Sequence, residues 1–142
     1  MDDKELIKQA FLARERAYAP YSGYLVGAAL LAADGCVYLG CNIENAAYSP
    51  TNCAERTAFF KAVSEGVTEF AAIAVVGAHK DARTADYTFF YPCGVCRQVM
   101  AEFCDPETFR IITARTEQEY TVRTLAQLLP DGFSKGRFTT HT

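Results

Sequence analysis

Pro92-Cys93-Gly94-Val95-Cys96 places two cysteines three positions apart, directly after a proline and at the expected start of a helix. A third cysteine, Cys53, stands at the expected start of another helix earlier in the chain. Amides at a helix N-terminus and the helix dipole lower the pKa of a thiol and favour the thiolate, which is the form that binds metal. We therefore expect Cys53, Cys93 and Cys96 to converge on one zinc site.

The number of available ligands indicates that this zinc site is open. A structural zinc site is normally closed by four protein ligands, whereas a catalytic site has three and leaves the fourth position to water. His79 lies in a polar loop and His141 in the tail, so both are expected to be solvated. Glu55 follows Cys53 by two residues and is the candidate general acid and base. In isolation a carboxylate there would be explained by the helix dipole, but beside three thiolates the catalytic role is the better explanation.

Composition and charge narrow the class of protein. Hydrophobic residues make up 50% of the chain and charged residues 22%, with 10 Phe and 8 Tyr, which predicts one folded domain over residues 1–142. Residues 135–142 are expected to form a flexible tail. The net charge of −3 provides no basic field for a long nucleic acid. No apolar run approaches the ~20 residues of a membrane span, and the acidic start at 1–5 lacks the order of a secretory signal. We expect a cytoplasmic protein that binds neither nucleic acid nor membrane.

A reducing compartment changes how the six cysteines are interpreted. Cytosolic thiols stay reduced, so three disulfides are not expected. Cys36, Cys41 and Cys104 stand singly in apolar or strand-like surroundings and are predicted to be small buried side chains. Cys93 and Cys96 also have the spacing of a thiol redox pair, which is an alternative to the zinc site.

Hydrophobic periodicity predicts a layered α/β fold. Helices are expected over residues 3–18, 53–65, 93–103 and 125–129, with Asn52 as the cap of the second, and strands over 24–32, 36–41, 70–76, 87–91 and 109–113. The first two strands form a hairpin around Asp34-Gly35. This order of elements predicts an α/β/α three-layer sandwich with a mixed sheet of about five strands.

Six motifs stand in a fixed order along nearly the whole chain. They are Ala19-Pro20-Tyr21-Ser22, Val26-Gly27-Ala28-Ala29-Leu30, Gly40-Cys41-Asn42-Ile43-Glu44-Asn45-Ala46, Cys53-Ala54-Glu55-Arg56, Pro92-Cys93-Gly94-Val95-Cys96-Arg97-Gln98, and Leu128-Leu129-Pro130 with Phe133. This set resembles the small homotetrameric cytidine deaminases, which are zinc-dependent. The chain departs from the family pattern at Tyr24, at Phe90-Tyr91 and in the longer segment 77–86, which affects the detail of the pocket and not the reaction.

The resemblance implies a cytidine deaminase-like fold, one Zn²⁺ per chain and a role in pyrimidine salvage. The implied reaction converts cytidine and 2′-deoxycytidine to uridine and 2′-deoxyuridine and releases ammonia, with zinc-bound hydroxide attacking C4 while Glu55 shuttles protons. Arg56 is expected to donate to the thiolate sulfurs and offset their charge. The substrate-binding residues implied by the resemblance are Tyr24, Asn42, Glu44, Ala54 and Phe133. It also implies a homotetramer with shared sites, in which Phe133 of one chain covers the base bound by another.

Three further interpretations stay open. A non-catalytic zinc-binding module would require a fourth ligand and has no use for Glu55. A deaminase of polynucleotides is disfavoured by the acidic charge balance, and a deaminase of a related base or nucleoside analogue is compatible with the same motifs. Two interpretations are equally compatible with Arg97 and Gln98: they support the metal site, or they lie on the helix surface.

Overall fold

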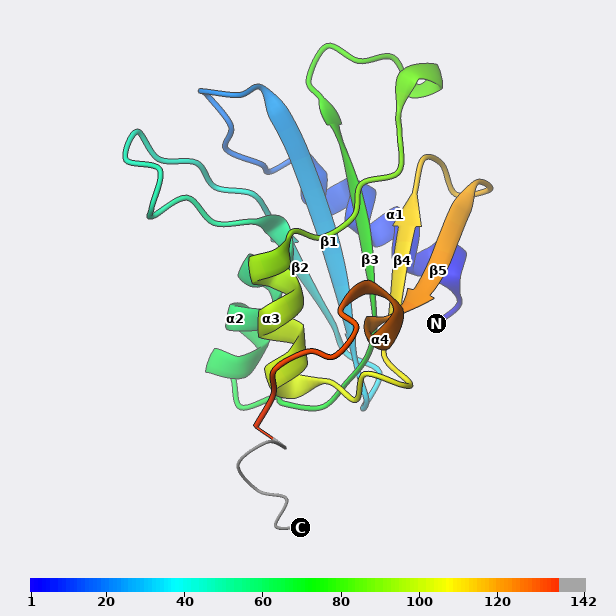
Figure 1. Cartoon of the computed structure of the whole chain (residues 1–142). Helices are drawn as coiled ribbons and strands as arrows, with labels where there is room; N and C mark the ends of the chain where they lie inside the picture. Colours follow the sequence, from blue (N-terminus) through cyan, green and yellow to red (C-terminus); the bar gives the residue numbers. More distant parts are fainter. Residues whose placement is uncertain (136–142) are drawn as a thin grey trace, which may run out of the picture.

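The computed structural model describes residues 1–135, and a mixed five-stranded sheet runs through it (Figure 1). Its strands are β1 (Tyr24–Ala32), β2 (Val37–Cys41), β3 (Phe70–His79), β4 (Arg110–Ala114) and β5 (Tyr120–Thr124). The order across the sheet is β2-β1-β3-β4-β5. β3 and β4 pair in parallel, and the other neighbours pair antiparallel.

Helices cover both faces of the sheet, which gives the three predicted layers. The helices are α1 (Asp3–Arg14), α2 (Ala54–Ser64), α3 (Gly94–Phe103) and α4 (Leu125–Leu128), with a 3₁₀ turn η1 (Thr84–Asp86). In Figure 1, α1 lies behind the sheet, and α2 and α3 lie side by side in front of it. The predicted α/β/α sandwich with a mixed sheet is confirmed.

The central strand β3 is buried on both faces, as its nearly continuous apolar sequence predicts. Ile73 and Val75 face the core formed with α2 and α3, while Ala72, Ala74 and Val76 face the core formed with α1. The small alanines suit the α1 side, where the helix lies close to the sheet. The side chains of β3 therefore fix the separation of both helical layers.

Several predicted boundaries move by a few residues. The first helix ends at Arg14, where residue 18 was expected, and β3 continues to His79. Cys53, and not Asn52, is the N-cap of α2, and its side chain makes no capping hydrogen bond. The thiol at the cap is therefore available to other partners.

The strand predicted over 87–91 is wrong, because that segment is irregular. Both edges of β3 are already paired, with β1 and β4, so no sheet edge is available to the segment. Its aromatic side chains pack instead: the Phe90 ring lies against Tyr24, 5.7 Å between centroids. The fifth strand is β5, an outer strand whose sequence Tyr-Thr-Val-Arg-Thr is half exposed and gives little hydrophobic signal.

The three single cysteines differ in burial. Cys104 is buried as predicted and Cys41 is partly buried, but the prediction is wrong for Cys36, which is exposed beside the Asp34-Gly35 turn. No helix among residues 1–135 is long and apolar enough to cross a membrane. Of the tail predicted over 135–142, residues 136–142 lie outside the described part of the chain, and His141 with them.

Gly40 in β2 allows α2 to lie directly on the sheet. A Cβ atom at Gly40 would lie 2.5 Å from the Ala58 nitrogen and closer still to the Ala54 carbonyl oxygen. Both contacts are to backbone, so no side-chain rotation relieves them. The close approach places the first turn of α2 against the sheet.

Replacing Gly40 with alanine is expected to lower the free energy of unfolding by about 2 kcal/mol, because the added methyl group overpacks the contact between β2 and α2. Urea denaturation followed by circular dichroism measures the change. Gly94→Ala is the matched control, since a Cβ atom at Gly94 meets nothing within 4 Å. Equal midpoints for the two variants would contradict the close approach.

Candidate metal centre and active site

The N-termini of α2 and α3 meet, and each begins at a cysteine. Cys53 is the N-cap of α2 and Cys93 is the N-cap of α3, both with extended backbone. Cys96 lies in the first turn of α3 and is buried, while Cys93 is exposed and Cys53 is partly buried. The predicted convergence of the three thiols is therefore present in the structure.

The three sulfur atoms are spaced as zinc requires. Cys53 Sγ lies 3.8 Å from Cys93 Sγ, which lies 3.6 Å from Cys96 Sγ, and all three lie within 4.8 Å of one another. Tetrahedral zinc with bonds of about 2.3 Å holds sulfur atoms about 3.8 Å apart. Soft thiolates in this arrangement select zinc over hard cations. Among residues 1–135, these three form the cluster capable of holding a metal ion, and the cluster offers three ligands and no fourth.

Charge around Cys53 favours its thiolate, whereas the hydrogen bond with Cys53, followed by burial, raises the pKa of the Cys96 thiol. Hydrogen bonding with the Cys96 thiol lowers the pKa of Cys53 to about 5; burial opposes this shift, and Arg56 reinforces it. The Arg56 guanidinium donates from Nη2 to Cys53 Sγ at 3.2 Å. Because the cluster lies at two helix N-termini, partial positive charges from the backbone amides add to that of Arg56.

Glu55 is buried without a partner. Only 1% of its surface is exposed, and neither carboxylate oxygen has a hydrogen-bond partner among the residues that the structure describes. Burial raises the pKa of this carboxyl to about 7, and the negative charge of Cys53 adds to the effect. An unsatisfied buried carboxylate costs free energy, so its retention in the first turn of α2 indicates that a ligand completes it.

A second set of predicted residues lies around the start of β1. Asn42 accepts from the Val26 amide at 2.9 Å and donates to the Tyr24 carbonyl at 2.8 Å, which fixes its carboxamide against the strand. Tyr24 packs against Phe90 and, with Cys53, against the core that contains Ala54 and Cys96. The structure thus brings Tyr24 and Ala54 to the same core as the thiol cluster.

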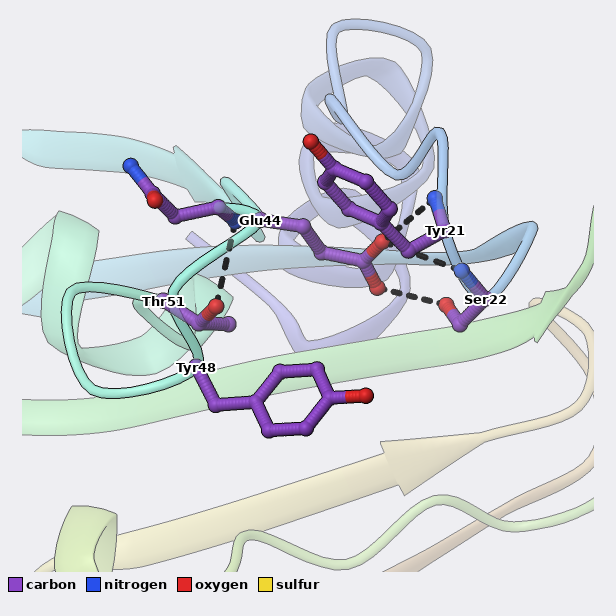
Figure 2. Close-up of a pocket in the computed structure, with 6 residues that line it drawn as sticks. Tyr21, Ser22, Glu44, Tyr48 and Thr51 are labelled. Carbon is purple, nitrogen blue, oxygen red and sulfur yellow. Dashed lines mark hydrogen bonds between the residues drawn. The ribbon is translucent and has the colours of Figure 1, made fainter.

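Glu44 lines a cavity of about 240 Å³ (Figure 2). Its carboxylate accepts from the amides of Tyr21 and Ser22, both at 3.1 Å, and from the Ser22 hydroxyl at 2.5 Å. The Ser22 hydroxyl, followed by the two amides, holds the pKa of Glu44 below its ordinary range, although slight burial opposes this. Figure 2 shows the Tyr48 ring on the other side of the cavity, and this ring is 87% exposed.

Phe133 lies in the segment that follows α4. Its ring is 59% exposed, and its carbonyl accepts from Gln98 Nε2 at 2.8 Å on α3.

Two residues that support the predicted site residues were not identified in the sequence analysis. Ser22 holds Glu44, and Phe90 closes over Gly77 and packs against Tyr24. Ser22 belongs to a quoted motif, but a lone serine in a turn carries no signal for a partner 22 positions away. Phe90 was visible only as a departure from the family pattern.

Comparison with known proteins agrees with this geometry. A family model described as "Cytidine and deoxycytidylate deaminase zinc-binding region" matches residues 1–112. A cytidine deaminase of Sporosarcina psychrophila is 53% identical over 135 residues, which cover 95% of this chain and 93% of the relative. One of Halalkalibacterium halodurans is 51% identical over 134 residues, which cover 94% and 96%. The crystal structure of cytidine deaminase from Burkholderia pseudomallei has a TM-score of 0.83 and 47% identity, covering 94% of this chain and all of that chain.

The matched region contains the three thiols and Glu55, and the structural match extends over nearly the whole sandwich. The resemblance inferred from the ordered motifs is confirmed. By sequence, by fold and by its zinc-binding region, this chain belongs to the cytidine deaminase family.

Proposed function

We propose that this chain catalyses the hydrolytic deamination of cytidine and 2′-deoxycytidine, giving uridine and 2′-deoxyuridine plus ammonia. Membership of the cytidine deaminase family supports the reaction. The observation that carries the proposal is Glu55, a buried carboxylate with both oxygens unpartnered, beside three thiols that converge. A purely structural zinc module would have a fourth ligand and would gain nothing from burying that carboxylate.

Zinc held by Cys53, Cys93 and Cys96 would supply a Lewis acid that lowers the pKa of a water molecule and orients it toward C4 of the base. Three thiolates around a divalent cation sum to one negative charge, which weakens this effect. Arg56 offsets that charge, because its guanidinium donates to the Cys53 sulfur. The two helix N-termini contribute further positive potential.

Glu55 moves the protons in this proposal. Its carboxylate accepts a proton from the attacking water and delivers it to N3 as the new C–O bond forms at C4. It then takes the remaining proton of that oxygen to the departing amine, so the C–N bond breaks and ammonia leaves. A carboxyl whose pKa is raised to about 7 by burial exchanges protons readily in both directions near neutrality. The N3 proton stays in the uracil product, and Glu55 returns to its starting state.

Glu44 and Asn42 are proposed to bind the sugar. The Glu44 carboxylate is held by three hydrogen bonds, two on Oε1 and one on Oε2, which leaves an acceptor position for a ribose hydroxyl. Asn42 is likewise fixed by one accepted and one donated bond, with further capacity on each atom. Both groups are thus oriented before the nucleoside arrives, which lowers the entropy cost of binding.

The base is proposed to contact Tyr24 and Ala54, with Phe133 supplied by another chain. Exposed aromatic residues on the described surface support a homotetramer with shared sites; they are Tyr18, Tyr21, Tyr48, Phe60, Tyr91 and Phe133. We also propose a cytoplasmic location and a role in pyrimidine salvage. A cluster of three thiolates is retained best where thiols stay reduced.

Cytidine offered to the purified protein should lose ultraviolet absorbance as it becomes uridine, and 2′-deoxycytidine should behave likewise. A zinc chelator should abolish the change, and added Zn²⁺ should restore it, because three thiol ligands hold the metal. Single-stranded DNA containing cytosine is the matched comparison substrate and should not react. Tight zinc binding without turnover of either nucleoside would contradict the proposal.

Glu55→Gln should lower kcat by about three orders of magnitude while zinc content stays at the wild-type level, because it removes the proton carrier and no ligand. Elemental analysis and the absorbance assay measure the two quantities. Glu65→Gln, which alters the exposed carboxylate at the other end of α2, is the control and should be fully active. Near-normal turnover in a zinc-loaded Glu55→Gln protein would rule the role out.

Glu44→Gln should raise KM for cytidine about tenfold and spare kcat, because a charged acceptor for the sugar is lost. The substituted amide still accepts from the two backbone amides on one oxygen, so the turn at Tyr21 and Ser22 is retained. Ser22→Ala keeps the carboxylate and should have a smaller effect on KM. Equal losses in kcat and kcat/KM, with unchanged affinity for a substrate analogue, would show that Glu44 acts in the transition state alone.

A further inference from the structure

Arg97 joins two segments that are distant in sequence. It lies on α3 directly after Cys96, and its side chain is partly buried. The guanidinium donates from Nε to the Pro92 carbonyl at 2.8 Å and from Nη1 to the Leu128 carbonyl at 2.6 Å. Pro92 precedes a metal ligand, and Leu128 is the last residue of α4. One side chain therefore holds both the residue that precedes the N-terminus of α3 and the C-terminus of α4.

The hydrogen bond from Arg97 to the Pro92 carbonyl affects the metal site through the adjacent residue, Cys93. The Pro92 carbonyl and the Cys93 nitrogen share one planar peptide unit, so the orientation of this carbonyl constrains the direction of the Cys93 side chain. Cys93 is exposed, and its side chain makes no capping bond, so packing does little to hold it. Hydrogen bonds from Arg97, through its side chain to Pro92 and its amide to the Cys93 carbonyl, restrain this ligand on both sides.

The bond to Leu128 bears on the segment that carries Phe133. This segment leaves α4, turns at Asp131 with a positive φ of 53°, and returns to α3 (Figure 1). At its far end Gln98 donates to the Phe133 carbonyl at 2.8 Å. Consecutive residues of α3 thus hold the two ends of the segment 128–133.

We infer that Arg97 is a positioning residue for two parts of the reaction, orienting Cys93 for zinc and the segment 128–133 for the base. The inference rests on the proposed function, because it assigns Phe133 to the nucleoside. The planar fork of arginine reaches both carbonyls at once, whereas a lysine ammonium has no such geometry and keeps only the charge. Gln98 serves the second part, because its side chain donates to the Phe133 carbonyl.

Two measurements separate positioning from simple stabilisation. The first is the rate at which zinc passes from the purified holoenzyme to a chromogenic chelator, and the second is KM against kcat for cytidine. Arg97→Gln should release zinc about tenfold faster and raise KM by a similar factor, with kcat changed less than about twofold, as expected when a group that orients a ligand is lost. Arg97→Lys should fall between this variant and wild type.

Gln98→Ala and Arg115→Gln complete the comparison. Gln98→Ala should raise KM and leave zinc release at the wild-type rate. The Arg115 guanidinium also donates to two backbone carbonyls, those of Tyr87 and Ala85. These carbonyls belong neither to Pro92 nor to the segment 128–133, so Arg115→Gln should leave both quantities unchanged.

Three results would overturn the inference. In the first, Arg97→Gln lowers the melting temperature but keeps both zinc release and KM within about twofold of wild type. Arg97 would then be a structural clamp only. A change in one quantity alone would refute the double role. An Arg115→Gln effect as large as that of Arg97→Gln would refute it also.

If Arg97→Gln fails to fold, the measurements on Arg97→Lys and Gln98→Ala decide between the two roles. Failure of the wild-type chain to deaminate cytidine would overturn the proposed function, while zinc release would still test the orientation of Cys93.

Discussion

The parallel pairing of β3 with β4 is the constraint on which the site depends. α2 precedes β3 and α3 precedes β4, and each helix runs back along the face of the sheet before its strand begins. When the two strands are parallel, the two preceding helices must start at the same end of the sheet. Cys53 and Cys93, which cap these helices, are therefore brought to 3.8 Å between sulfur atoms. An antiparallel pair would have placed the two thiols at opposite ends of the sandwich.

Desolvation then sets the chemistry of the group beside the thiols. Glu55 occupies the first turn of α2, where the dipole favours a carboxylate, yet burial raises its pKa to about 7. The same close packing of α2 on Gly40 that brings Cys53 into position removes water from Glu55. The position of Cys53 and the burial of Glu55 therefore both depend on the close packing of α2 against β2.

Apart from the convergence of the three thiols, the sequence predicted local features and missed those that depend on distant pairing. The thiols, Glu55 and both helix starts could be identified because spacing and helix signals are short-range properties. The segment 87–91 was misread as a strand because aromatic content resembles strand content, while the occupied edges of β3 that exclude it are a tertiary property. β5 was missed for the opposite reason, since an outer strand needs little apolar sequence. Ser22 could not be identified because its partner is 22 residues away.

Backbone carbonyls, more than side-chain pairs, hold this site together. Arg97 binds the carbonyls of Pro92 and Leu128, Asn42 binds that of Tyr24, and Gln98 binds that of Phe133. Such contacts fix where loops run whatever side chains the loops carry, so the residues at loop tips are able to differ while their positions stay the same. Tyr24 and Phe90 illustrate this arrangement: the aromatic pair fills the space above Gly77, and the backbone around it is held independently. The three thiols and Glu55, in contrast, lie at the starts of helices whose positions the parallel pairing of β3 and β4 fixes.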